Sequence, residues 1–237
     1  MTTLPSDGRL APIGGKIAEF LDQLRARQPA PSAHAGRGRL IFALDATASR
    51  APTWDRACAI QGEMFEATAT LGGLDLQLVF FRGYDECRAS RWVSTAADLH
   101  QLMRSVAVKG GETQIERVLN HVIRETGKCR VSALIFVGDS MEEKADRLCR
   151  LAGDLAALGA PIFLLHEGFD PDAAAVFRQM ATLSRGAYLA FDLASIDRLK
   201  ELLGAIAVYA TGNHAALAAY GANKGGAVLR LTAQLKK

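Results

Sequence analysis

The stretch IFALDATASR, residues 41–50, decides how the rest of the sequence is interpreted. An apolar run ends there in Asp45, and hydroxyl side chains follow at alternate positions, Thr47 and Ser49. A carboxylate at the end of a buried strand is costly unless something pairs with it. Two interpretations are open at this point. The segment is either a strand-to-helix turn with ordinary capping residues, or part of a metal site.

Segments of strand and helix character alternate from Arg39 onward. Apolar runs of strand length lie at 40–44, 76–81, 131–137, 161–165 and 187–191, and helical periodicity covers about 52–71, 115–123, 142–158, 171–184 and 195–210. This alternation predicts a doubly wound α/β fold, with a mostly parallel central sheet and helices on both faces. The charged, alternating segment CRASRWV (87–93) predicts one antiparallel edge strand, in a hairpin with 76–82.

Composition divides the chain into three parts. Residues 1–37 combine a short amphipathic helix with a linker rich in Pro, Ala, Ser and Gly. Residues 38–210 form the α/β domain, and residues 211–237 form a C-terminal tail with a small helical pattern. The cysteines Cys58, Cys87, Cys129 and Cys149 show no C-x-x-C spacing, so we expect free thiols.

The bulk properties exclude several classes of partner. A net charge of +3 over 237 residues, with no basic run, does not indicate nucleic-acid binding. No apolar stretch is long enough to span a membrane, and the first residues do not resemble a secretory signal. We therefore expect a cytoplasmic protein without a membrane partner. The high content of Ala and Arg suggests a GC-rich bacterial source.

Further oxygen-bearing side chains follow other predicted elements. Asp139 comes after the strand at 131–137, and Thr113 stands behind Gly110-Gly111 before the helix at 115–123. In open parallel sheets, ligands bind beyond the carboxyl ends of the strands. Together with Asp45, Thr47 and Ser49, these residues offer two carboxylates and three hydroxyls, which suit Mg²⁺, or else Mn²⁺ or Ca²⁺. Two aspartates only neutralise a divalent ion, so its Lewis acidity stays available for an acidic side chain from outside.

This set of motifs resembles the metal-ion-dependent adhesion site (MIDAS) of the von Willebrand factor type A (VWA) family. The family's first motif is D-x-S-x-S, and here Thr47 takes the middle position. The resemblance implies that Thr47 and Ser49 ligate the metal through their hydroxyls and that Asp45 and Asp139 hold it largely through water. It implies that Thr113 binds directly or through water, depending on conformation. It also implies protein binding without catalysis.

Other interpretations of the same residues remain open. T-Q-I-E (113–116) and S-M-E-E (140–143) each have the pattern of a capping box, which would explain Thr113 without a metal. His166 and Glu167 follow a strand and are expected to be solvated loop residues. Gly138-Asp139-Ser140-Met141 is similar to the G-D-S-L block of serine esterases, but no histidine has an aspartate three residues before it. Catalysis is not expected.

The sequence thus predicts a divalent-metal-dependent protein-binding module. An Asp or Glu of the partner would complete the coordination of a weakly held Mg²⁺. By analogy with the family, the partner would belong to a multi-protein assembly or one containing an AAA+ ATPase. Two alternatives stay open: a scaffold subunit that uses its termini without metal, and a metal-assisted hydrolase.

Overall fold

The computed structural model describes residues 37–51, 66–67, 73–191, 196–222 and 226–235. Its strands are β1 (Gly38–Asp45), β2 (Leu74–Arg82), β3 (Glu86–Val93), β4 (Ala133–Gly138), β5 (Ile162–Glu167) and β6 (Ala187–Phe191). Its helices are the short 3₁₀ helix η1 (Ala48–Arg50), α4 (Ala96–Arg104), α5 (Ile115–Lys128), α6 (Ala145–Ala157), α7 (Pro171–Leu183), α8 (Ile196–Ala222) and α9 (Gly226–Leu235). The predicted N-terminal helix, and nearly all of the helix predicted at 52–71, lie outside these residues.

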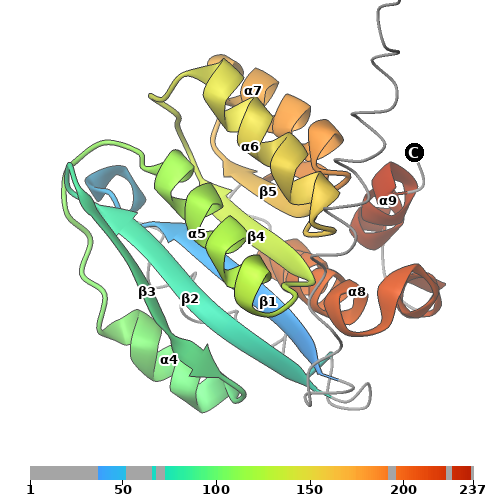
Figure 1. The fold of residues 1–237 in the computed structure, drawn as a ribbon. Coiled ribbons are helices and arrows are strands. Elements are labelled where there is room, and N and C mark those ends of the chain that lie inside the picture. The colour runs from blue at the N-terminus through green and yellow to red at the C-terminus, as the bar shows by residue number, and fades with distance from the viewer. Residues whose placement is uncertain (1–36, 52–65, 68–72, 192–195, 223–225, 236–237) are drawn as a thin grey trace, which may run out of the picture.

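The described strands form one sheet in the order β3-β2-β1-β4-β5-β6 (Figure 1). The pairs β1–β2, β1–β4, β4–β5 and β5–β6 are parallel, and β2–β3 is antiparallel. The predicted fold class and the antiparallel edge strand are therefore confirmed. The strand order reverses between β1 and β4, which is where ligands bind in sheets of this kind.

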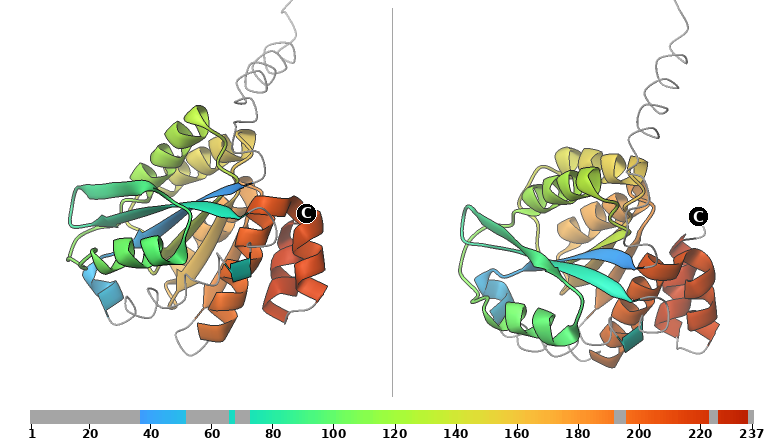
Figure 2. Two further views of the ribbon diagram at one scale, coloured as in Figure 1. Left: turned by 90° about the horizontal axis from the view of Figure 1, so that it is seen from below. Right: turned by 60° about the horizontal axis from the view of Figure 1, so that its bottom comes forward.

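Helices cover both faces of the sheet, as Figure 2 shows. One face packs against α5, α6 and α7 through a buried cluster that includes Ile41, Phe81 and Phe136. The other face packs against α4, α8 and α9 through a cluster that includes Leu40, Phe42 and Leu44. Successive residues of β1 alternate between the two clusters because side chains of a strand point to opposite faces. Burial on both sides explains why the central strands are almost continuously apolar.

Two elements on the second face differ from the sequence prediction. Helix α4 was not predicted, although Thr95 caps it by accepting a hydrogen bond from the amide of Asp98 at 3.1 Å. Helix α8 continues to Ala222, so it crosses the predicted boundary between the domain, which ends at 210, and the tail, which begins at 211.

The predicted tail contributes to the core. Val228 and Leu231 of α9 are buried in the same cluster as β1. The side chain of Gln234 bonds to both main-chain groups of Tyr188 on β6, at 3.0 and 3.1 Å. No helix within the described residues is long and apolar enough to cross a membrane.

Candidate functional site

The carboxyl end of β1 holds the first part of the predicted site. Asp45 is fully buried, and its Oδ1 accepts a 2.7 Å hydrogen bond from the amide of Thr47. This bond turns the chain sharply after the strand, as aspartate commonly does through its own backbone two residues on. The side-chain oxygens of Thr47 and Ser49 consequently lie 3.0 Å apart. The D-x-T-x-S motif thus folds into one compact group of oxygen atoms.

In the structure this separation is a hydrogen bond between the two hydroxyls, and adjacent ligands of an octahedral metal have a similar separation. Two adjacent ligands at the usual Mg²⁺–O distance lie about 3 Å apart. Hydroxyl and carboxylate oxygens are also the ligands that hard cations prefer. The residues at the end of β1 therefore fit a divalent metal.

The carboxyl end of β4 brings Asp139 to the same edge. Leu44 pairs with Val137, so Asp45 and Gly138 follow side by side on neighbouring strands. A Cβ built on Gly138 would lie 3.7 Å from the Cβ of Asp45, and it would meet the Phe136 ring at 2.8 Å. Because residue 138 has no side chain, the Phe136 ring can lie close to its main chain.

His166 fixes the main chain of Asp139. It belongs to β5 and is buried, as is Glu167, so the expectation of solvated loop residues at both positions is wrong. The ring atom Nε2 lies 3.2 Å from the carbonyl oxygen of Asp139, and Nδ1 lies 2.9 Å from the hydroxyl of Tyr188. Because a carbonyl only accepts, Nε2 carries a proton and donates a hydrogen bond to Asp139. With both nitrogens engaged, His166 is not placed to act as a general base for Ser140.

The loop before α5 is held against the ends of β1 and β2. The amide of Lys109 donates to the carbonyl of Ala46 at 3.0 Å, and the amide of Glu112 donates to Gly83 at 3.2 Å. A Cβ on Gly111 would lie 2.0 Å from the oxygen of Gly83, so only glycine permits this approach. The same construction on Gly110 meets nothing within 4 Å. Close packing therefore explains Gly111 but not Gly110.

Thr113, which ends this loop, binds two glutamates that the sequence analysis did not assign to the site. Its amide donates to Glu142 Oε2 at 2.6 Å, and its hydroxyl donates to Glu143 Oε2 at 2.5 Å. The hydroxyl also accepts a 3.0 Å bond from the amide of Glu142. Glu143 Oε1 accepts from the amide of Glu116, 3.2 Å away in the first turn of α5. Two carboxylates from the segment after Asp139 thus secure Thr113 and the start of the helix.

Neither of the two predicted capping boxes is formed in the structure. The N-cap of α5 is Gln114, and its side chain makes no capping bond; the cap comes from Glu143, far along the chain. Helix α6 begins at Ala145 behind Lys144, so residues 140–143 precede it and do not cap it. The physical reason is that a carboxylate from another loop outcompetes the local pattern, as it brings charge to the positive end of the helix. The E-E pair after Asp139 was the only sequence signal for this contact.

The structure places the predicted ligands in two groups, and the hydrogen bonds of Thr113 that it describes do not reach the first group. Asp45, Thr47 and Ser49 form the first, with Asp139 on the adjacent strand end. Thr113 is joined to the segment after Asp139 through its bonds to Glu142 and Glu143. Within the described residues, no three His, Cys, Asp or Glu side chains form a metal-binding group. It remains a prediction that these five residues bind a metal together.

The cysteines that the structure describes are free thiols. Cys87, Cys129 and Cys149 form no disulfide, whereas Cys58 lies outside the described residues. Burial raises the pKa of Cys87 to about 11, although the nearby charges of Arg117 and Arg124 act in the opposite direction.

Comparison with known proteins confirms the resemblance at the level of the fold. No protein-family model and no curated protein matches this sequence. Among solved structures, the SpRpn10 VWA domain matches with a TM-score of 0.55 and 10% identity, over 69% of this chain and 95% of that one. A von Willebrand factor type A structure from Catenulispora acidiphila matches at 0.57 and 16% identity, over 75% of this chain and 43% of that one. The chain therefore has the fold of a VWA domain.

One further structure with this fold carries a metal. Proximal thread matrix protein 1 from the mussel byssus, with a zinc-occupied MIDAS motif, matches with a TM-score of 0.51 and 16% identity. The match covers 73% of this chain and 46% of that one. A MIDAS on this fold is thus able to hold a divalent metal in that protein.

Proposed function

We propose that this protein is a divalent-metal-dependent protein-binding module. Asp45, Thr47, Ser49, Thr113 and Asp139 would hold the ion, with Mg²⁺ as the expected metal and Mn²⁺ or Ca²⁺ as alternatives. The bound ion would supply positive charge for an Asp or Glu of a protein partner. That partner would belong to a multi-protein assembly or to an assembly that contains an AAA+ ATPase.

One observation carries this proposal: the hydroxyl oxygens of Thr47 and Ser49 lie 3.0 Å apart beside the fully buried Asp45, at the point where strand order reverses. Asp139 follows Gly138, which lies beside Asp45 on the neighbouring strand end. The metal-bearing MIDAS of the mussel protein supports the same chemistry on the same fold. No catalytic step is part of the proposal.

Glu142 and Glu143 add to the local charge. They place two carboxylates beside Thr113, in addition to those of the predicted ligands Asp45 and Asp139. Both accept hydrogen bonds from Thr113, and Glu143 also accepts one from the helix amide. We therefore assign them to positioning Thr113 and not to the metal, and we retain weak metal binding that a partner carboxylate strengthens.

The test is a titration with Mn²⁺, followed by electron paramagnetic resonance of the free ion, with and without acetate as a model carboxylate. The wild type is expected to bind Mn²⁺, and acetate is expected to tighten that binding. Thr47→Val removes a ligand at nearly constant volume and should weaken binding by at least about tenfold, the effect of about 1.4 kcal/mol. Ser132→Ala removes a hydroxyl at the opposite edge of the sheet and serves as the control.

Two results would count against the proposal. Equal Mn²⁺ affinity of the wild type and Thr47→Val would place the metal elsewhere. An affinity that acetate leaves unchanged would exclude completion by an external carboxylate, and would favour the scaffold that uses its terminal helices.

A further inference from the structure

A second concave site lies on the face of α5 turned toward the edge strand β3, away from the carboxyl-edge residues. It is a cavity of about 280 Å³ lined by Val79, Cys87, Arg88, Ala89, Arg117, Asn120, His121 and Arg124. We call it the arginine pocket. This size lies at the small end of ligand pockets in proteins.

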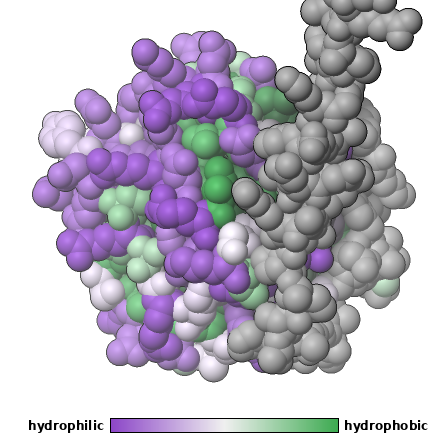
Figure 3. Space-filling view, in the orientation of Figure 1, coloured by the Kyte–Doolittle hydropathy of each residue, from purple (hydrophilic) through white to green (hydrophobic). Residues whose placement is uncertain are grey.

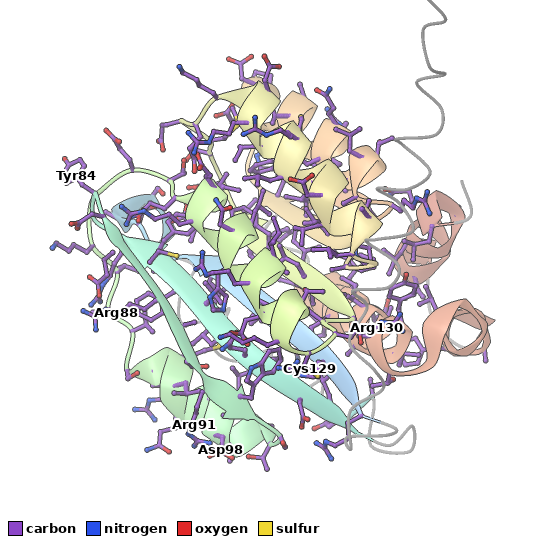
Figure 4. The ribbon with its side chains drawn as sticks, in the orientation of Figure 1. Tyr84, Arg88, Arg91, Asp98, Cys129 and Arg130 are labelled. Atoms are coloured by element: carbon purple, nitrogen blue, oxygen red, sulfur yellow. The ribbon has the colours of Figure 1, made fainter. Side chains whose placement is uncertain are left out.

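The arginine pocket carries an excess of positive charge. Its lining, which belongs to the described residues, contains three arginines and a histidine but no carboxylate. Arg117 and Arg124 lie seven residues apart on α5, and therefore on one side of that helix. Arg88 lines the cavity only from the strand β3, because its side chain lies on the opposite face of the sheet. It is paired with Phe80, whereas Cys87 is paired with Phe81 on the face that packs against α5. Figure 4 shows Arg88 at the outer edge of the sheet.

The neighbouring carboxylates do not neutralise this charge. Glu86 lies 2.9 Å from Arg88, but it is shared with Arg82, which contacts both of its oxygens. On α5, Glu116 pairs with Arg147 at 2.5 Å, and Glu125 pairs with Lys128 at 2.7 Å.

Among the residues that the structure describes, the other two guanidinium groups have no acidic partner. Arg117 donates to neutral acceptors, the carbonyl of Asp85 and the side-chain oxygen of Gln114. Within the described part of the chain, Arg124 makes no ion pair. A guanidinium has five N–H donors, so both retain donors for a ligand.

A hydrogen-bond network fixes the inner wall of the pocket. The amide nitrogen of the buried Gln77 donates to the carbonyl of Ser90 at 2.9 Å, and its oxygen lies 2.8 Å from His121 Nε2. The amide oxygen only accepts, so Nε2 of His121 is the donor. Ser90 lies where the β2–β3 pairing is irregular, between Gln77 and Val79. The histidine is thereby held in one orientation beside the arginines.

We propose that the arginine pocket binds the phosphate group of a small phosphomonoester. Guanidinium groups bind tetrahedral oxyanions through paired, charge-assisted hydrogen bonds, and here Arg117 and Arg124 offer two of them on one side of α5. The cavity is concave and small, which favours a free metabolite-sized molecule over an extended polymer. The surrounding face is mostly hydrophilic (Figure 3), as expected for a polar ligand. This inference does not rest on the proposed metal site.

Titration with inorganic phosphate tests the proposal, with sodium chloride adjusted to keep ionic strength constant and amide NMR shifts as the readout. The wild type should bind saturably, with shifts centred on α5 and β3. Arg117→Gln and Arg124→Gln should each weaken binding by about tenfold, the usual loss for a hydrogen bond to a charged group. Arg91→Gln is the matched control, because Arg91 also lies on β3 but pairs with Asp98 at 2.7 Å.

Further arms identify the ligand. Glycerol phosphate should bind at least as tightly as inorganic phosphate, and acetate should bind at least about tenfold more weakly, because it offers fewer acceptor oxygens to the two guanidiniums. Equal affinity for acetate would overturn the phosphate assignment. Identical titrations of the wild type and both pocket variants, all with unchanged thermal stability, would overturn the site itself. Tighter binding of a phosphoserine peptide than of glycerol phosphate would overturn the small-molecule ligand.

Discussion

The carboxyl edge and the arginine pocket lie in different parts of the sheet, one at the ends of the central strands and the other between α5 and the edge strand β3. Their charged groups are of opposite sign. The first gathers aspartates and hydroxyls where β1 and β4 end, and its key carboxylate, Asp45, is fully buried. The second places Arg117 and Arg124 on the side of α5 that faces β3, and both side chains are exposed. The proposed cation site and the proposed anion site therefore lie on different elements, and each is testable without the other.

The two regions also differ in how they are built. Strand ends and tight backbone contacts hold the carboxyl edge, so its changes should affect stability. Side chains from a helix surface and an edge strand form the arginine pocket, so its changes should affect charge with little effect on stability.

The largest effect is expected for Gly111→Ala. The new Cβ would lie 2.0 Å from the carbonyl oxygen of Gly83, so the loop before α5 must move. Overpacking of this kind costs about 1–3 kcal/mol in the free energy of unfolding, which urea denaturation measures. Gly110→Ala is the control, because its Cβ would meet nothing within 4 Å, and its stability should match or exceed the wild type. Equal stability of the two variants would contradict the close contact at Gly83.

A smaller loss is expected for Glu143→Ala. This change removes the acceptor for the Thr113 hydroxyl and the cap on the amide of Glu116. Loss of a cap and of a charged acceptor costs about 1–2 kcal/mol, to be measured by thermal or urea unfolding. Glu112→Ala, in the same loop with an exposed side chain, should change stability by less than about 0.5 kcal/mol. A Glu143→Ala protein as stable as Glu112→Ala would show that the glutamate does not secure α5.

The smallest effect concerns the charge of the arginine pocket. Burial raises the pKa of the Cys87 thiol to about 11, and the positive charges of Arg117 and Arg124 lower it in part. Only the thiolate reacts, so alkylation of Cys87 by iodoacetamide should be slow near neutral pH and should accelerate as pH rises toward 11. Arg117→Gln removes one favourable charge and should slow alkylation roughly threefold, a Coulomb effect of about 0.6 kcal/mol.

Mass spectrometry of the individual cysteine peptides measures this rate, with Cys129 as an internal reference and Arg91→Gln as the control. An unchanged rate in Arg117→Gln would mean that this arginine does not set the potential in the pocket.

Most of the fold was predictable because hydrophobic patterns record it directly. The runs around Phe42, Val79, Ile135 and Leu164 are buried on both sides, so they identified the parallel strands. Alternation of apolar and charged residues in 87–93 identified the edge strand, because that strand is not buried on both sides. Helix α4 was missed because it is short and its only strong signal is the Thr95 cap.

The candidate site was predictable only in part. The placement of Asp45 and Asp139 at one edge follows from strand order, since Asp45 ends β1 and Asp139 directly follows the neighbouring parallel strand β4. The bonds from Thr113 to Glu142 and Glu143 depend on the shapes of two loops, which local sequence does not determine. The arginine pocket needs a tertiary contact between β3 and α5, so spacing along α5 indicates only Arg117 and Arg124.

The central claim is that the carboxyl edge binds a divalent metal, and thermal unfolding with and without Mg²⁺ tests it most directly. The comparison uses the wild type and Asp45→Asn, which keeps the side-chain oxygen that accepts from Thr47 but loses the charge. Mg²⁺ at ten times its Kd should stabilise the wild type by about 1.4 kcal/mol and leave Asp45→Asn unchanged. The same stabilisation of both proteins, or of neither, would contradict a metal site at the end of β1.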